Sequence, residues 1–313
     1  RDILHLMGPR TISILLERAK VTVDTMLASL ISLYSVTFLN LAVQLAVFPV
    51  SFFAAAIGQA AFPFLSKAAR GKDLSSFKNH MSVALTHITF FLAPTTVLLV
   101  VLHTPLIRLI FGSRLFSWEA TFLTSWTLVF LSLGILFQGL GGLLARGFFA
   151  LYDTRTPLIV TFFSLLSTIV LNVLFVTVFV LPVWSLAIAT TIGAIANAVT
   201  LFVLLDRRVG GFDHFTLFIS FTKILFISFF LTIFSSAAFK FFEQFFDTSQ
   251  TLSLLAFTLL IAFLSLVFYL LLSFVFNLEE YKELMKFLEK VRRAPQALRG
   301  RLIAANESTK VNP

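Results

Sequence analysis

Thr156–Leu205 reads TPLIVTFFSLLSTIVLNVLFVTVFVLPVWSLAIATTIGAIANAVTLFVLL and contains no Asp, Glu, Lys or Arg. A helix needs roughly 20 mostly apolar residues to cross about 30 Å of hydrocarbon, so this stretch is long enough for two crossings. Its one break is Leu181-Pro182-Val183-Trp184, where proline disfavours a continuous helix. The sequence therefore predicts two membrane helices here, joined as a tight antiparallel hairpin.

The same length criterion predicts eight spans along the chain, near residues 11–30, 36–62, 82–102, 121–145, 157–180, 182–205, 216–239 and 251–276. Hydrophobic residues make up 58% of the 313 residues and charged residues 12%, against roughly 25% charged residues in a soluble domain. The apolar runs are continuous rather than alternating, which favours helices over a β-barrel. The predicted fold class is an all-α polytopic membrane bundle of about eight transmembrane helices.

The net charge of +9 comes from short basic clusters between apolar runs. This pattern indicates membrane topology, and no nucleic-acid partner is expected because no basic face is interleaved with stacking aromatic residues. With the first residues inside, eighteen of the 24 Lys and Arg residues lie on the inner side and three in outer loops. Both ends are therefore predicted to be cytoplasmic. No enzyme motif occurs, and the absence of Cys excludes disulfides and thiolate sites, so we expect a transporter rather than an enzyme.

The two ends of the chain carry their own expectations. Residues 278–303 have apolar residues at helical spacing among basic ones and are predicted to form a cytoplasmic amphipathic basic helix. This helix would lie on anionic headgroups or extend as a solvated tail. Residues 304–313 lack apolar periodicity and are predicted to be disordered. No signal-peptide pattern opens the chain, and we expect it to begin within a longer protein.

The first span carries four ionisable residues at membrane depth, namely Glu17, Arg18, Lys20 and Asp24. Each would cost roughly 2.5–3.5 kcal/mol if it faced lipid. Glu17, Lys20 and Asp24 share one helix face, on which Lys20 can bridge both carboxylates. This face suits the wall of a hydrated cavity, although Glu17, Arg18 and Lys20 could instead snorkel to the headgroups. Asp24 is too short to snorkel, so a functional role is predicted for it.

Neutral polar residues also lie inside predicted spans. Thr168 and Asn172 share one face of the fifth span, and Thr190 and Thr191 lie in the sixth. Neutral oxygens together with one carboxylate suit a small hard cation such as Na+. Such residues also form hydrogen bonds between membrane helices, and on these residues alone that interpretation is the better one.

A series of short motifs occurs in a characteristic order. The motifs are Met7-Gly8-Pro9, Val23-Asp24-Thr25, Ala28-Ser29, Ser35-Val36, Phe48-Pro49, Gly58-Gln59-Ala60-Ala61-Phe62-Pro63-Phe64-Leu65-Ser66, Leu144-Ala145-Arg146-Gly147-Phe148-Phe149-Ala150 and Asp153-Thr154-Arg155-Thr156-Pro157. Their order and spacing resemble the MviN/MurJ family of lipid II flippases, within the multidrug/oligosaccharidyl-lipid/polysaccharide exporter superfamily.

The resemblance implies a fourteen-span carrier of which this chain is one part. Residues 1–210 would form the second six-helix transmembrane lobe, residues 211–277 would add two transmembrane helices, and the N-terminal lobe would lie outside this sequence. Alternating access would move lipid II, a lipid-linked peptidoglycan precursor, across the bacterial cytoplasmic (inner) membrane for cell-wall synthesis. The implied partners are lipid II or a related polyprenyl-pyrophosphate glycan, membrane lipids and the N-terminal lobe.

The resemblance also implies a monovalent-cation site for the coupling ion. By motif this site falls on Asp24, Thr168, Asn172 and Thr190, with Na+ as the ion. No other cofactor is expected.

The predicted substrate-binding residues are Glu17, Arg18 and Lys20, whose two cations would attract the pyrophosphate. The second span departs from the family, which often has an Asp-Arg pair and a further acid where this chain has Val43, Gln44 and Val47. That span cannot clamp a pyrophosphate by charge. The predicted function is lipid II translocation. The alternatives are transport of another lipid-linked oligosaccharide or a drug, or a non-transporting scaffold for cell-wall synthesis.

Overall fold

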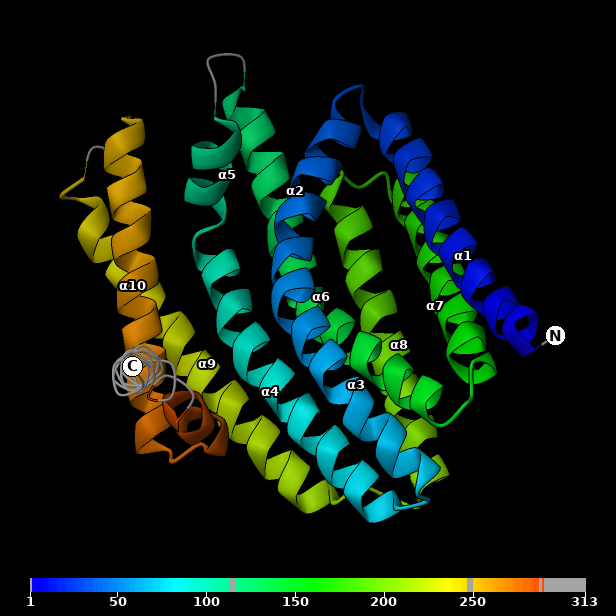
Figure 1. Ribbon diagram of the computed structural model, residues 1–313. Helices are drawn as coiled ribbons and strands as arrows, with labels where there is room; N and C mark the ends of the chain where they lie inside the picture. Colours follow the sequence, from blue (N-terminus) through cyan, green and yellow to red (C-terminus); the bar gives the residue numbers. More distant parts are fainter. Residues whose placement is uncertain (1, 113–115, 247–249, 287–288, 290–313) are drawn as a thin grey trace, which may run out of the picture.

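The computed structural model describes residues 2–112, 116–246, 250–286 and 289, without the side chains of residues 2–14 and 17. These residues form a bundle of helices that run alternately up and down (Figure 1). The elements are α1 (Asp2–Ile31), α2 (Ser35–Pro49), the π-helical turn η1 (Val50–Ala54), α3 (Ala55–Arg70), α4 (Leu74–Val101), α5 (His103–Phe111), α6 (Trp118–Ala150), α7 (Arg155–Val173), the π-helical turn η2 (Leu174–Val178), α8 (Trp184–Val209), α9 (His214–Glu243) and α10 (Thr251–Val275). In the described residues no strand occurs, and the predicted all-α class is confirmed.

Seven helical segments in the described part are long and apolar enough to cross a bilayer. Each matches a predicted span, and the two that flank Pro182 form the predicted hairpin. A continuous helix satisfies every backbone group within the segment, which hydrocarbon requires. The short helix α5, between α4 and α6, was not predicted because its nine residues are too few for a span.

The remaining predicted span, near residues 11–30, falls on α1, which is not among these seven segments and stays a predicted span. It lies beside α7 at the edge of the bundle (Figure 1). Its 30 residues would extend about 45 Å at the usual rise per residue. Four of its six Asp, Glu, Lys and Arg residues lie in one stretch, from Glu17 to Asp24. The polar contacts of this stretch form the candidate site described below.

The second span is interrupted rather than straight. Pro49 ends α2, and the chain continues through the π-helical turn η1 into α3 without leaving the helical path. Proline lacks the N–H that would continue the hydrogen-bond ladder, and a π-helical turn absorbs the mismatch. The turn leaves backbone carbonyls near Ala54 and Ala55 available to another helix.

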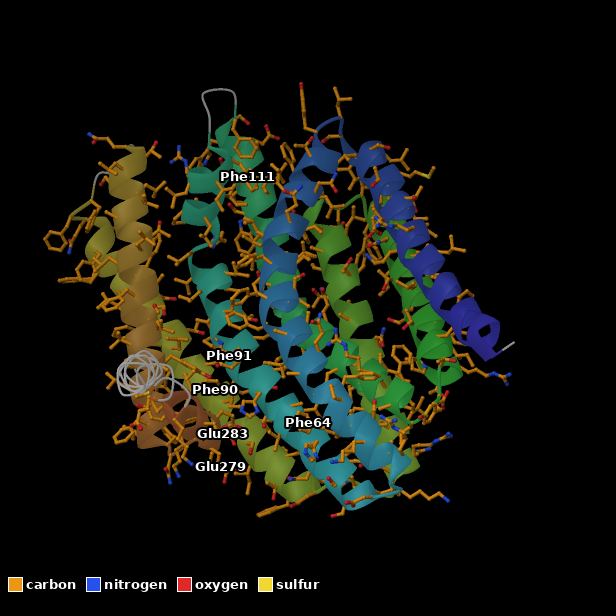
Figure 2. The ribbon with its side chains drawn as sticks, in the orientation of Figure 1. Phe64, Phe90, Phe91, Phe111, Glu279 and Glu283 are labelled. Carbon is orange, nitrogen blue, oxygen red and sulfur yellow. The ribbon has the colours of Figure 1, made fainter. Side chains whose placement is uncertain are left out.

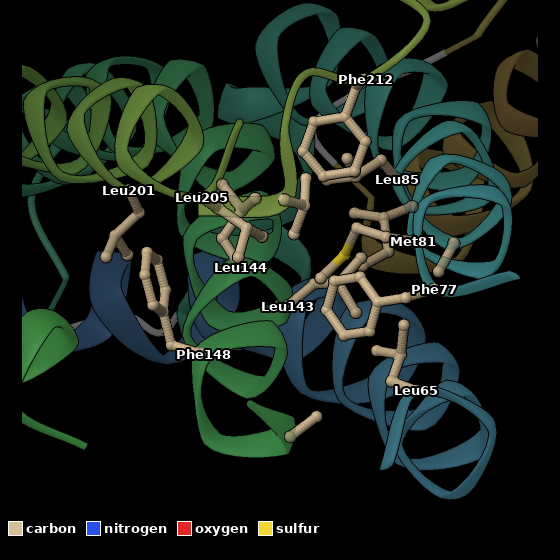
Figure 3. Close-up of a cluster of buried hydrophobic side chains, with 14 of the residues drawn as sticks. Leu65, Phe77, Met81, Leu85, Leu143, Leu144, Phe148, Leu201, Leu205 and Phe212 are labelled. Carbon is tan, nitrogen blue, oxygen red and sulfur yellow. The ribbon is translucent and has the colours of Figure 1, made fainter. Parts of the chain in front are cut away.

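The main apolar core joins α3, α4, α6 and α8 near one end of the bundle (Figure 3). Phe77 and Met81 of α4 pack there with Phe148 of α6 and Leu205 of α8, and all four are essentially buried. At Gly147 a Cβ would lie 2.2 Å from Met81 Cε, the end of a flexible side chain, so a larger residue here would require Met81 to move. The core therefore fixes α6 and α8 as the shared centre of the bundle.

The helices α9 and α10 pack beside α4 and α5. The buried Tyr269 hydroxyl of α10 donates a hydrogen bond to the Phe90 carbonyl of α4 at 2.8 Å. Ser235 of α9 and Ser265 of α10 share a hydrogen bond of 2.7 Å between their hydroxyls. These two helices thus extend the bundle on the side away from α1 (Figure 1).

The segment after α10 turns back onto the protein. Residues 279–286 are helical, Leu278 is buried, and Tyr281 and Leu284 pack against the cluster around Phe90. Glu283 lies 3.0 Å from His87 of α4, at the end of the bundle opposite Phe111 (Figure 2). The described start of the predicted 278–303 helix therefore contacts the protein itself. The remainder of that helix, except residue 289, and the predicted disordered residues 304–313 lie outside the described residues.

The turn between α6 and α7 is held by Asp153. Its Oδ1 accepts hydrogen bonds from the N–H groups of Arg155 and Thr156 at 3.1 and 3.0 Å, and its Oδ2 accepts one from the Thr156 hydroxyl at 2.8 Å. Arg208, near the end of α8, lies 3.8 Å from the same carboxylate. Burial raises the pKa of Asp153, but the hydrogen bonds from Thr156 and Arg155 and the charge of Arg208 outweigh it, so this pKa lies below its ordinary value.

We expect Asp153→Asn, which keeps a capping oxygen and removes the charge, to melt at a lower temperature than wild type at pH 7. Because the folded pKa is below the unfolded value of roughly 3.9, the stabilisation is present above that value and is lost as pH falls through the folded pKa. Melting curves in detergent should therefore converge in acid. Asp153→Ala also removes the cap and should cost about 0.5–2 kcal/mol. A constant gap between Asp153→Asn and wild type at every pH would contradict this account.

Candidate functional site

A cavity of about 460 Å³ lies between α1, α2, α6, α7 and α8 and is open on one side, where its lining residues Val21 and Val47 are exposed. Its charged lining residues are Lys20 and Asp24, both on α1. The neutral polar residues of its wall are Thr25, Asn40, Gln138, Thr161, Ser164, Thr168, Thr190 and Asn197. Side chains of this kind inside a membrane bundle typically face a water-accessible space rather than lipid.

Asp24 is the centre of the polar network. Its Oδ2 lies 2.5 Å from Lys20 Nζ, one helical turn earlier on α1. Its Oδ1 accepts a hydrogen bond of 2.7 Å from Asn172 Nδ2 on α7. The Lys20 ammonium also donates to Thr190 Oγ1 on α8, at 3.2 Å. One carboxylate and one ammonium therefore connect three helices.

The helices α7 and α8, which carry Asn172 and Thr190, are in close contact beside this network. Ser164 Oγ donates to the Gly193 carbonyl at 2.7 Å, and Thr168 Oγ1 donates to the Ser164 carbonyl at 2.9 Å. A Cβ on Gly193 would lie 2.0 Å from Thr168 Oγ1, so the two helices can meet here only because residue 193 is glycine. This close approach places Thr168 and Thr190 on the same cavity wall.

The structure brings together five of the seven predicted site residues. Lys20, Asp24, Thr168 and Thr190 line the cavity, and Asn172 is buried behind Asp24. These positions are compatible with the predicted roles in substrate and ion binding, which stay predictions. Thr191, the neighbour of Thr190, faces away and donates to the Phe130 carbonyl of α6 at 2.7 Å, so it forms an interhelical hydrogen bond.

The other two predicted residues do not join this network. Arg18 is exposed and is not part of the cavity wall. The side chain of Glu17 lies outside the described residues, so its predicted contact with Lys20 also stays a prediction. Val43 and Val47, which replace charged residues of the family, do line the cavity. The α2 wall is therefore apolar at these two positions, as the sequence predicts.

Arg146, one residue beyond the predicted span 121–145, makes a polar contact within the bundle that the sequence did not predict. It lies within α6, and its Nη1 is 3.4 Å from the Ala54 carbonyl and 3.5 Å from the Ala55 carbonyl. These carbonyls belong to the π-helical turn and the start of α3. The guanidinium occupies the space that a Cβ on Gly58 would fill. Pro49 followed by a distant glycine is the only sequence signal of this contact, and it is a weak one.

The fold and the cavity define a multi-pass helical membrane protein with a cavity between its helices, an arrangement typical of membrane transporters. The family model of the lipid II flippase MurJ matches residues 1–259, and the chain therefore belongs to this family.

Individual relatives agree with this assignment. The chain is 34% identical over 103 residues to the lipid II flippase MurJ of Thermosipho africanus. This matched segment covers 33% of this chain and 22% of that protein. It is 27% identical over 197 residues to the probable lipid II flippase MurJ of Vibrio cholerae, covering 63% of this chain and 37% of that protein. A solved lipid II flippase MurJ in an inward closed conformation superposes with a TM-score of 0.71 at 26% identity. That match covers 91% of this chain and 55% of the solved one, so the chain spans about half the length of that relative.

We expect Gly193→Ala to lower the melting temperature in detergent, because its methyl group would collide with Thr168 Oγ1 and force α7 and α8 apart. Overpacking of this kind typically costs about 1–3 kcal/mol. The matched control is Gly142→Ala on α6, whose Cβ would meet no atom within 4 Å and should leave stability unchanged or raised. Adding Thr168→Ala to Gly193→Ala should restore part of the loss. Equal melting temperatures for the two single variants would contradict the close contact.

Proposed function

We propose that the protein translocates lipid II across the bacterial cytoplasmic membrane by alternating access, and that the cavity is this chain's part of the path. The observation that carries the proposal is a cavity between five helices that bears the Lys20–Asp24 pair on its wall, in a chain of the MurJ family. Side chains that are costly in lipid face this cavity.

The proposed division of labour follows the packing. In this proposal, residues 1–210 form one six-helix lobe around α6, and α9 and α10 within residues 211–277 are accessory helices attached to α4. The chain spans 55% of the solved flippase it matches, so helices outside this sequence would complete the cavity. The basic residues Lys67, Arg70, Arg207 and Arg208 lie at one end of the bundle and support a cytoplasmic orientation of that end.

The substrate chemistry follows from the charges at the cavity. Lys20 is the cationic residue among the described residues of the cavity wall. Arg18 lies two residues away on the exposed side of α1. Both cations would attract an anionic pyrophosphate, whereas the apolar wall at Val43 and Val47 adds no charge to hold it. Because Asp24 already engages Lys20, this lobe alone would hold a pyrophosphate weakly. In the proposal, further cations come from helices outside this sequence.

The test is to fill the cavity. Ala194 lines the cavity on α8, whereas Ala196 on the same helix is exposed on its outer side. In cells depleted of their own flippase, we expect the full-length gene with Ala196→Trp to sustain growth and the same gene with Ala194→Trp to fail. The readout is lipid II in the outer leaflet, measured by its cleavage by an enzyme added outside. We expect at least a tenfold loss for Ala194→Trp, which corresponds to about 1.4 kcal/mol.

Membrane levels and melting temperatures of both variants are the control, and Ala194→Leu serves as a milder filling. A non-transporting scaffold predicts equal growth for all variants that reach the membrane at wild-type level. Transport of a different lipid-linked glycan or a drug predicts that the wild-type gene leaves lipid II in the inner leaflet. Either result would overturn the proposal.

A further inference from the structure

The Lys20 ammonium lies where the cavity gathers its oxygens. It is 2.5 Å from Asp24 Oδ2 and 3.2 Å from Thr190 Oγ1. Both ends of the ion pair are largely buried, with 18% of the Lys20 side chain and 13% of the Asp24 side chain exposed. The other Asp24 oxygen is taken by the Asn172 amide. The carboxylate thus has a partner on both oxygens within the protein.

A free monovalent cation would need these same oxygens. Hard cations bind carboxylate, carbonyl and hydroxyl oxygens, and Asp24 and Thr190 supply the two that Lys20 now contacts. Asp24 and Lys20 are the charged groups among the described cavity-lining residues, and their charges sum to zero. A bound Na+ would add an uncompensated positive charge inside a membrane bundle, which is costly. With Lys20 in place, the residues do not fit Na+.

We infer that Lys20 is a tethered cation, which occupies the Asp24–Thr190 site in place of a free monovalent ion. The lysine stem is flexible and its ammonium is a compact point charge with three donors, so it can replace a small cation among oxygens. Removing the lysine would free Asp24 Oδ2 and Thr190 Oγ1 from their contact with the ammonium. In addition, Asn172 Oδ1 is buried nearby without a hydrogen-bond partner. A Na+ site is therefore present in the fold and is exposed only when Lys20 is lost.

The binding part of this inference is independent of the substrate. The consequence for coupling rests on the proposed function: if the protein transports lipid II, a tethered cation makes that transport independent of external Na+. The experiment below uses the purified full-length protein without lipid, so it can fail while transport succeeds, and the cavity-filling test can fail while this one succeeds.

The experiment compares thermal melting and radioactive Na+ binding in NaCl and in choline chloride at equal ionic strength. We expect wild type to melt at the same temperature in both salts and to bind no stoichiometric Na+. Lys20→Met should bind about one Na+ per chain, with an affinity at least tenfold above wild type, and should melt higher in NaCl by ligand linkage. Lys20→Arg keeps a cation and should resemble wild type.

Three controls keep the test sharp. Arg18→Met removes an exposed cation two residues away and, like wild type, should bind no stoichiometric Na+ and melt at the same temperature in both salts. Adding Asp24→Asn to Lys20→Met should abolish the Na+ response. Glu17→Gln removes the carboxylate three residues before Lys20. This variant, like wild type, should show no Na+ response.

Two outcomes overturn the inference. The first is a saturable Na+ response in wild type as large as that of Lys20→Met. The second is the absence of a Na+ response in both Lys20→Met and Lys20→Gln, the latter included in case the methionine variant does not fold.

Discussion

Asp24 places a carboxylate on a helix at membrane depth, where a charge without a partner costs several kcal/mol. Its two oxygens bind Lys20 from its own helix and Asn172 from α7, while Lys20 reaches on to Thr190 of α8. Leu27 and Ala28 of α1 are buried in an apolar cluster toward the end of the helix, and the polar network lies before them. The position of α1, and with it one wall of the cavity, therefore depends on the neutralisation of this charge together with that apolar packing.

The rest of the bundle has the opposite character. Near one end, α3, α4, α6 and α8 enclose a dry core in which Phe77, Met81 and Phe148 are fully buried (Figure 3). The helices α6 and α8 belong both to this core and to the cavity wall. Arg146 of α6 links the two regions, because its guanidinium contacts the carbonyls beside the π-helical turn of the second span. The apolar core and the cavity thus share their central helices, and the π-helical turn η1 lies between the two regions.

Hydropathy was sufficient to predict the seven helices of the described residues that are long and apolar enough to span a membrane, because the cost of polar groups in hydrocarbon is read directly from composition. Helical spacing also predicted that Lys20 and Asp24 share a face. Spacing says nothing about which helix a face meets, so the contact of Lys20 with Thr190 required the tertiary structure. For the same reason the adjacent Thr190 and Thr191 could not be told apart, although one faces the cavity and the other α6. The contact of Arg146 was not predicted because its partners are backbone carbonyls, for which the sequence carries only a weak signal.

The pairing of Lys20 with Asp24 also determines how the cavity responds to a membrane potential. Moving one elementary charge across the membrane is worth about 2.3 kcal/mol per 100 mV. A movement of α1 that keeps the pair together carries no net charge, whereas a free cation at the same oxygens would carry one. The remaining described residues of the cavity wall are neutral. In the proposed transport cycle, a tethered cation would leave the substrate as the charge that crosses the membrane, and for an anionic substrate an inside-negative potential would favour outward movement. The energy that a mobile ion would otherwise have to supply is then available from the membrane potential itself.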